Sequence, residues 1–213
     1  MKSVGYILLV LFTALNCVAY FPPQPFPGAV GSTNTTAMHM STNAFVSWAD
    51  SYTNMLYGDG VSETWRTPEK ALGQAAGDSF DIVSLGRGGM ITLSFPNGIA
   101  DGEGFDFAIF ENAISDTFLE LAWVEVSSDG TNFVRFPNYS LTPEEVGPYG
   151  SVSPSFLHGY GGKYRQGYGT PFDLSELHLV HGSILAAADN FSTSYETAVS
   201  YTHLRAHETN NSI

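Results

Sequence analysis

The sequence is poor in basic residues. Of its 213 residues only 8 are Lys or Arg, against 21 Asp or Glu, so the formal net charge is −13 at pH 7. A protein of this charge repels phosphate backbones and anionic membranes, which argues against nucleic-acid binding. Acidic surfaces are common on exported proteins, and the charge by itself therefore identifies no partner.

Cysteine is almost absent, and there is one long apolar run. Lys2 precedes a nearly apolar stretch at 4–15, which has the length of a secretory signal and is too short to span a bilayer. Small residues at Cys17 and Ala19 predict cleavage after Ala19; lipid modification of Cys17 is an alternative that the bulky Asn16 disfavours. Cleavage removes the only cysteine, so the mature chain has no disulfide. We expect a secreted or cell-surface protein of the bacterial envelope, without membrane insertion after cleavage.

Apolar residues are plentiful enough for a core, at 43% of the chain, and 22 glycines and 11 prolines divide them into short runs. Alternating apolar residues predict strands at 90–95, 105–110 and 121–126, and a turn at 129–130 leads into another at 133–136. The second of these has an apolar face formed by Phe105, Phe107 and Ile109. The pattern indicates an all-β protein, namely a β-sandwich or jelly roll.

Three segments have the signals of short helices. Apolar residues recur at helical spacing at Phe45, Trp48, Ala49, Tyr52 and Leu56. In the segment 67–73, Thr67 can cap, Pro68 can begin and Gly73 can end a helix of one to two turns. Residues 141–147 repeat that pattern. We therefore expect a few short helices beside the strands.

Several acids lie within the predicted strands, and side-chain alternation accounts for most of them. A period of two places Asp106 opposite Phe107 and Glu125 opposite Val124. Glu111 is the exception because it shares the face of Phe107, and a buried carboxylate there must be paired, hydrogen-bonded or metal-bound. Alternatively, the strand ends just before Glu111, which then caps the next turn.

Three stretches carry a family resemblance: DIVSLGRGGMITLSFPNGIADGEGFDFAIFENA at 81–113, ELAWVEVSSDGTNFVRFP at 120–137 and GGKYRQGYGTPFDLSEL at 161–177. In this order they resemble a family of secreted bacterial cell-surface proteins, many of which end in a PEP-CTERM sorting signal. VEVSSDGTNF also resembles discoidin-like, galactose-binding-like domains. The resemblance implies a β-jelly-roll that binds carbohydrate, often holds a structural calcium ion and has no enzymatic activity.

The chain departs from that family near its C-terminal end. Residues 198–213 read AVSYTHLRAHETNNSI, show no strand alternation and resemble translated sequencing-adapter read-through. We therefore expect a signal peptide at 1–19, a Pro/Ser/Thr-rich leader at 20–42, an incomplete β-sandwich domain at 43–197 and a non-native tail. Loss of a central strand would leave unpaired sheet edges.

The stretch DGEGFD at 101–106 predicts a metal site. It places Asp101, Glu103 and Asp106 in a Gly-rich loop. Carboxylates at alternate loop positions are ligands that Ca²⁺ prefers. The resemblance to galactose-binding-like domains implies that such a calcium ion would be structural. Solvated turn acids without a metal are the alternative.

The stretch HGYGGKYRQGYGTPF at 158–172 predicts a ligand-binding loop. Exposed tyrosines stack on sugar rings and polar neighbours bind the hydroxyls. The candidate ligand-binding residues are Tyr160, Tyr164, Tyr168, Lys163 and Arg165. In the alternative interpretation the tyrosines pack on the edge of the sandwich. Trp65 and Trp123 are further candidate platforms, whereas Trp48 is expected in the core.

No motif of a catalytic class is present. GRGG at 86–89 leads into a strand and lacks the Lys-Ser/Thr end of a phosphate-binding loop, and no GxSxG nucleophile elbow occurs. We therefore predict that the protein is not an enzyme but an exported module that binds glycan or another envelope polymer. The alternatives are a purely structural or adhesive domain and a polysaccharide hydrolase that uses paired carboxylates.

Overall fold

A computed structural model describes residues 21–147, 149–177 and 199–206. The signal peptide predicted for residues 1–19 lies outside the described residues. The described chain is rich in antiparallel strands and has a few 3₁₀ turns, so the predicted all-β class is confirmed. None of these helical turns has the length and apolarity needed to cross a membrane.

The strands are β1 (Met38–His39), β2 (Ser51–Leu56), β3 (Met90–Ile99), β4 (Phe107–Ile109), β5 (Ala122–Ser127), β6 (Val134–Arg135), β7 (Tyr139–Ser140), β8 (Leu157–His158), β9 (Tyr160–Gly161), β10 (Tyr168–Phe172) and β11 (Val199–Ala206). The 3₁₀ helices are η1 (Glu63–Trp65), η2 (Pro68–Ala71) and η3 (Pro154–Phe156).

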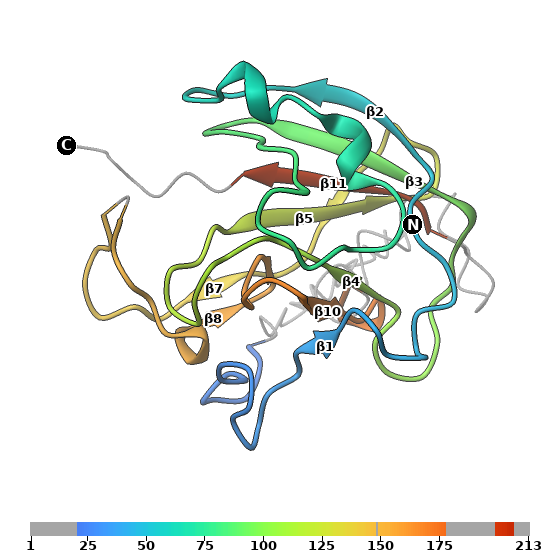
Figure 1. The fold of residues 1–213 in the computed structure, drawn as a ribbon. Helices are drawn as coiled ribbons and strands as arrows, with labels where there is room; N and C mark the ends of the chain where they lie inside the picture. Colours follow the sequence, from blue (N-terminus) through green and yellow to red (C-terminus); the bar gives the residue numbers. More distant parts are fainter. Residues whose placement is uncertain (1–20, 148, 178–198, 207–213) are drawn as a thin grey trace, which may run out of the picture.

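The largest sheet has the order β2-β3-β11-β5-β6, and β9 pairs with one end of β5. A three-stranded sheet has the order β1-β10-β4, and β7 pairs with β8. Figure 1 shows β2, β3, β11 and β5 in the upper part of the molecule and β1, β4 and β10 below them.

Strand β11 lies in the C-terminal segment, whose sequence shows no strand alternation. Its backbone pairs with β3 on one side and β5 on the other, with Leu204 opposite both Ile91 and Val124. Backbone hydrogen bonding does not require alternating side chains, which is why the sequence pattern did not reveal this strand. The non-native origin of residues 198–213 stays a prediction.

The main core lies between the two larger sheets. Phe107 of β4 and Phe172 of β10 stack at 5.3 Å, and Phe136 meets Phe172 edge-on at 4.9 Å. Val124 and Val126 of β5 are fully buried in the same cluster. The predicted alternation is therefore confirmed for β5. The prediction that Phe105 lies on the buried face of a strand is wrong. Strand β4 begins only at Phe107, and the Phe105 side chain is 51% exposed.

Glu125 lies on the other face of β5, as predicted, but it is not solvated. The residue is only 8% exposed, and its Oε1 accepts hydrogen bonds from Arg135 Nε at 2.8 Å and Nη2 at 2.6 Å. The Arg135 guanidinium also lies over the ring of Trp123, 4.4 Å from its centroid. A two-point ion pair of this kind compensates for removing the carboxylate from water.

Two of the three predicted helices are wrong. Residues 51–56 form β2, whose backbone pairs with β3 and places Tyr52 opposite Leu93, so sheet pairing outweighs the helical spacing at 45–56. Residues 141–147 contain bends and no helix. The segment 67–73 does form η2, and Gly73 ends it with a φ of +76°, a left-handed conformation that favours glycine.

The described part of the predicted leader, 21–42, is folded against the sheets rather than extended. Phe26 is fully buried, and its ring lies 5.4 Å from that of His158. Thr36 and Tyr164 share a hydrogen bond of 2.9 Å between their hydroxyl groups, and β1 pairs with β10. This segment therefore contributes side chains to the core.

Replacement of Phe26 tests that contribution. Phe26→Ala is expected to lower the free energy of unfolding by about 3–5 kcal/mol, because it empties a buried ring-sized space. Chemical denaturation followed by tryptophan fluorescence measures the change. Phe80→Ala is the control, since that residue is 70% exposed, and it should cost below about 1 kcal/mol. An equally small effect at Phe26 would show that residues 21–42 do not belong to the folded domain.

Candidate functional site

A cavity of about 530 Å³ lies between β3 and β4. Its apolar lining includes Ile91 and Leu93 of β3 and Ile109 of β4, and the loop at 73–87 forms one wall. Apolar side chains contribute the larger part of its lining and charged and amide side chains the rest, a mixture that is found in small-molecule sites.

Side-chain hydrogen bonds fasten the loop at 73–87 over the cavity. The Thr67 hydroxyl donates to the carbonyl of Ile82 at 2.7 Å, and Lys70 Nζ donates to the carbonyl of Phe80 at 2.7 Å. Asn112 Nδ2 donates to the carbonyl of Ser79 at 3.2 Å. These donors lie in Thr67 just before η2, in η2 itself and in the segment after β4, so the wall is held from two sides.

Three aromatic rings form a cluster at the cavity. Phe45 and Trp48 lie 5.2 Å apart between ring centroids, and Phe110 lies 5.5 Å from each of them. Trp48 and Phe110 line the cavity. Trp48 was expected in the core; it is half-buried instead, and one part of its side chain is available to a ligand. We refer to these three residues as the aromatic cluster.

Two carboxyl groups, Glu111 and Glu120, also line the cavity and hydrogen-bond to one another. Glu111 Oε2 accepts a hydrogen bond from the amide of Ala113 at 2.6 Å. Burial, followed by the nearby negative charge of Glu120, raises the pKa of Glu111 to about 8. Both interpretations of Glu111 thus hold in part. Strand β4 ends before Glu111, which caps the next turn, and the Glu111 carboxyl is also buried and needs its hydrogen-bond partners.

Gly162 allows the chain to approach this carboxyl pair. Its φ is +79°, and a Cβ there would lie 2.0 Å from the carbonyl oxygen of Glu120 and 3.3 Å from Cγ of Glu111. Any side chain would therefore push the loop away from both acids. The sequence contained this signal in the Gly-Gly pair after Tyr160, but only the structure shows what the glycine faces.

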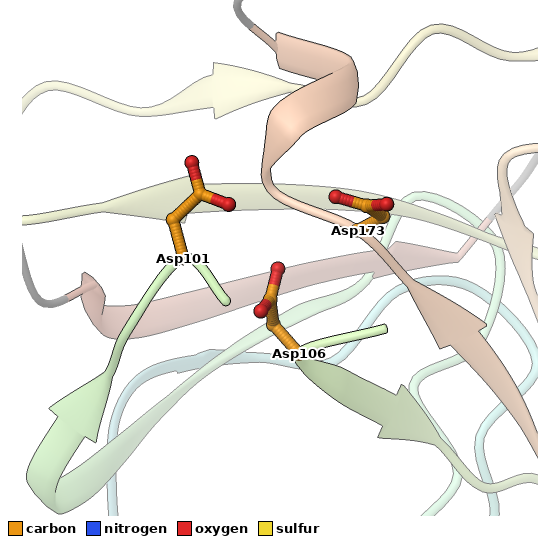
Figure 2. Close-up of side chains that lie close together, drawn as sticks. All are labelled: Asp101, Asp106 and Asp173. Atoms are coloured by element: carbon orange, nitrogen blue, oxygen red, sulfur yellow. The ribbon is translucent and has the colours of Figure 1, made fainter. Parts of the chain in front are cut away.

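A second group of acids, the aspartate triad, consists of Asp101, Asp106 and Asp173. One carboxylate oxygen from each lies within 4.8 Å of the others. Figure 2 shows the three side chains around a common space, from the loop after β3, the residue before β4 and the residue after β10. The structure therefore brings two of the three predicted metal ligands together. Glu103 is exposed and does not belong to this group.

Asp106 fixes the geometry of the triad. Its Oδ1 accepts from the amide of Gly102 and its Oδ2 from the amide of Leu174, both at 2.7 Å. Burial raises the pKa of Asp106, and the charges of Asp101 and Asp173 act in the same direction. Sequence spacing could not identify Asp173, because only the pairing of β10 with β4 places it beside the loop.

The structure does not place the residues of the predicted ligand-binding loop on an exposed surface. Tyr164 is 1% exposed, and Tyr160 and Lys163 are buried as well. Lys163 Nζ donates to the carbonyl of Leu157 at 2.7 Å, and burial lowers its pKa to about 7. Arg165 pairs with Asp116 at 2.6 Å.

The fifth residue of that set, Tyr168, is half-buried, and its ring packs edge-on against His39 at 4.9 Å. These five side chains therefore do not form an exposed stacking surface. The alternative interpretation, in which the tyrosines pack on the edge of the sheets, describes the structure. The tyrosine rings and the glycines between them pack against the core. The Gly-rich composition of the stretch, which is typical of a loop, did not reveal this packing.

Comparison with protein-family models, curated proteins and solved structures found no match to this chain. The resemblance to secreted cell-surface proteins and to galactose-binding-like domains therefore stays a prediction.

The carboxyl pair predicts a pH-dependent stability. Glu111 has a pKa of about 8 in the folded chain and about 4.3 in an unfolded one, so the folded state retains a proton that the unfolded state loses. The free energy of unfolding should fall as the pH rises between these values, by about 2.5 kcal/mol from pH 5 to pH 7. Denaturation at both pH values measures this fall.

Glu111→Gln is expected to remove that part of the pH dependence, because a carboxamide does not titrate. Glu145→Gln is the matched control, since Glu145 is exposed and lies outside the cavity lining. It should keep the wild-type slope. The same slope in Glu111→Gln and in the wild type would contradict the raised pKa.

Proposed function

We propose that this chain is an exported, non-catalytic module that binds a carbohydrate or another cell-envelope polymer in the cavity between β3 and β4. The single observation that carries the proposal is the combination of the aromatic cluster with polar groups in one cavity wall. Sugar rings have apolar faces that pack on aromatic side chains, and their hydroxyls need a few directed hydrogen-bond partners. Glu111, Glu120 and Asn112 supply such partners here.

The geometry favours binding over hydrolysis. A retaining glycosidase needs its two carboxyl groups about 5 Å apart, and an inverting enzyme needs a wider separation that admits water. Glu111 and Glu120 interact with each other at short range, an arrangement that neither of these two geometries describes. The pair therefore suits recognition of a ligand rather than attack on it.

Retention on immobilised polysaccharides tests the proposal. Trp48→Ala is expected to weaken retention by at least about tenfold, because the ligand loses its stacking surface. Trp65→Ala is the control: Trp65 stacks on Phe80 outside the cavity lining, and its loss should leave retention unchanged. Circular dichroism melts confirm that both variants fold. Equal retention of the two variants would favour a purely structural or adhesive domain.

The aspartate triad supports a second part of the proposal, a structural Ca²⁺ ion. Oxygens that share one Ca²⁺ lie about 2.3–2.6 Å from it, so they can be at most about 5 Å apart. The three aspartate oxygens meet this limit. An ion there would tie the loop after β3 to the residue after β10, and thereby hold the two larger sheets together at one end.

Thermal melts with and without calcium test the ion. In excess Ca²⁺ the wild-type melting temperature should be at least about 3 °C higher than in EGTA, because the folded state alone binds the ion. Asp173→Asn should remove this difference. Glu103→Gln is the control, because Glu103 lies outside the triad, and it should keep the difference. Identical wild-type melts in Ca²⁺ and EGTA would exclude a structural ion.

A further inference from the structure

The carboxyl pair and two rings of the aromatic cluster line the same cavity. Phe110 connects them, because it precedes Glu111 in the chain and its ring lies 5.5 Å from that of Trp48. Trp48, Phe110, Glu111 and Glu120 all line the cavity. Aromatic faces attract cations through their ring quadrupole, and carboxylates attract them through charge. The two features therefore favour the same kind of ligand group.

The bases around the cavity do not neutralise the carboxyl pair. Lys70 lies 3.7 Å from Asp81 and donates to the carbonyl of Phe80. Neither Lys70 nor Arg87 forms an ion pair with Glu111 or Glu120 within the described residues.

The remaining charged residues that line the cavity are acids. Asp78 accepts a hydrogen bond from the amide of Phe80, and Asp81 faces Lys70. Acids thus outnumber bases around the cavity, as they do in the chain as a whole. A positive charge at the carboxyl pair would be favourable for both local and long-range electrostatics.

We propose that the ligand of this cavity carries a quaternary ammonium group, which lies against Trp48 and is neutralised by the carboxyl pair. This inference rests on the proposed function, because it assigns a chemical class to the ligand of the same cavity. A quaternary ammonium has no hydrogen to donate, so it requires aromatic faces and nearby negative charge rather than directed hydrogen bonds. The apolar side chains of Ile109 and Leu93 suit its methyl groups.

Binding of such a cation is linked to release of a proton. The ligand charge takes the place of the proton that Glu111 holds at neutral pH, and it binds the form in which Glu111 is ionised. With a pKa of about 8, that form makes up about a tenth of the protein at pH 7 and about nine-tenths at pH 9. The apparent affinity should therefore rise about tenfold between these pH values.

Choline is a suitable probe, because its quaternary charge does not depend on pH. Its uncharged isostere 3,3-dimethylbutan-1-ol has the same shape and serves as the matched ligand. Isothermal titration at pH 7 and pH 9 should show choline binding about tenfold more tightly at pH 9, and weaker, pH-independent binding of the isostere. Equal affinity of the two ligands, or choline affinity that does not rise with pH, would overturn the inference.

Two variants assign the effect to the carboxyl pair. Glu111→Gln should abolish the pH dependence and weaken choline binding at pH 9 by at least about tenfold, whereas Glu145→Gln should match the wild type. Wild-type affinity and pH dependence in Glu111→Gln would overturn the inference even if choline binds.

The outcomes also separate this inference from the proposed function. In one outcome, polysaccharide retention depends on Trp48 but the protein does not prefer choline over its isostere. This result would contradict the quaternary ammonium ligand and still support a polysaccharide-binding module. Choline binding that is lost in Trp48→Ala, without retention of any polysaccharide, would support the ammonium ligand and overturn the carbohydrate.

Discussion

The contact of Phe107 with Phe172 fixes the register of the short strand β4 against β10, and both rings pack in one buried cluster with the valines of β5 from the larger sheet. Strand β4 has only three residues, and both candidate sites begin at its ends. Asp106 precedes it and belongs to the aspartate triad, whereas Glu111 follows it and belongs to the carboxyl pair. Any shift of β4 against β10 would therefore displace both sites.

Burial shifts the pKa values of Glu111 and Lys163, but only Glu111 is a candidate for function. Burial shifts the pKa of Glu111 upward and that of Lys163 downward, so desolvation favours the neutral form of both. Lys163 donates to a backbone carbonyl and lies outside the cavity lining, which makes it part of the fold. Glu111 lines the cavity beside a second acid and an aromatic ring. A perturbed acid in such a place is a candidate for function, since structural stability alone does not require it.

Parts of the fold followed from local patterns, and the errors have a common cause. Period-two alternation identified the buried faces at Val124 and Val126, and Pro68 with Gly73 identified η2. The helix expected at 45–56 and the exposed tyrosine loop were wrong. In both cases a contact with a distant segment decided the outcome: β3 pairs with β2, and Thr36 from the segment before β1 bonds to Tyr164. Local spacing contains no information about such partners.

The sequence by itself determined the faces of β5 and the all-β class, and it placed Asp101 and Asp106 in one loop, because these depend on neighbours within a few residues. Only the tertiary structure decided that Asp173 completes the triad and that Trp48 and Glu120 line one cavity with Glu111. These residues are far apart in the chain, and the pairing and packing of whole strands bring them together. Such pairing depends on backbone hydrogen bonds and on complementary buried surfaces, which no short stretch of sequence specifies.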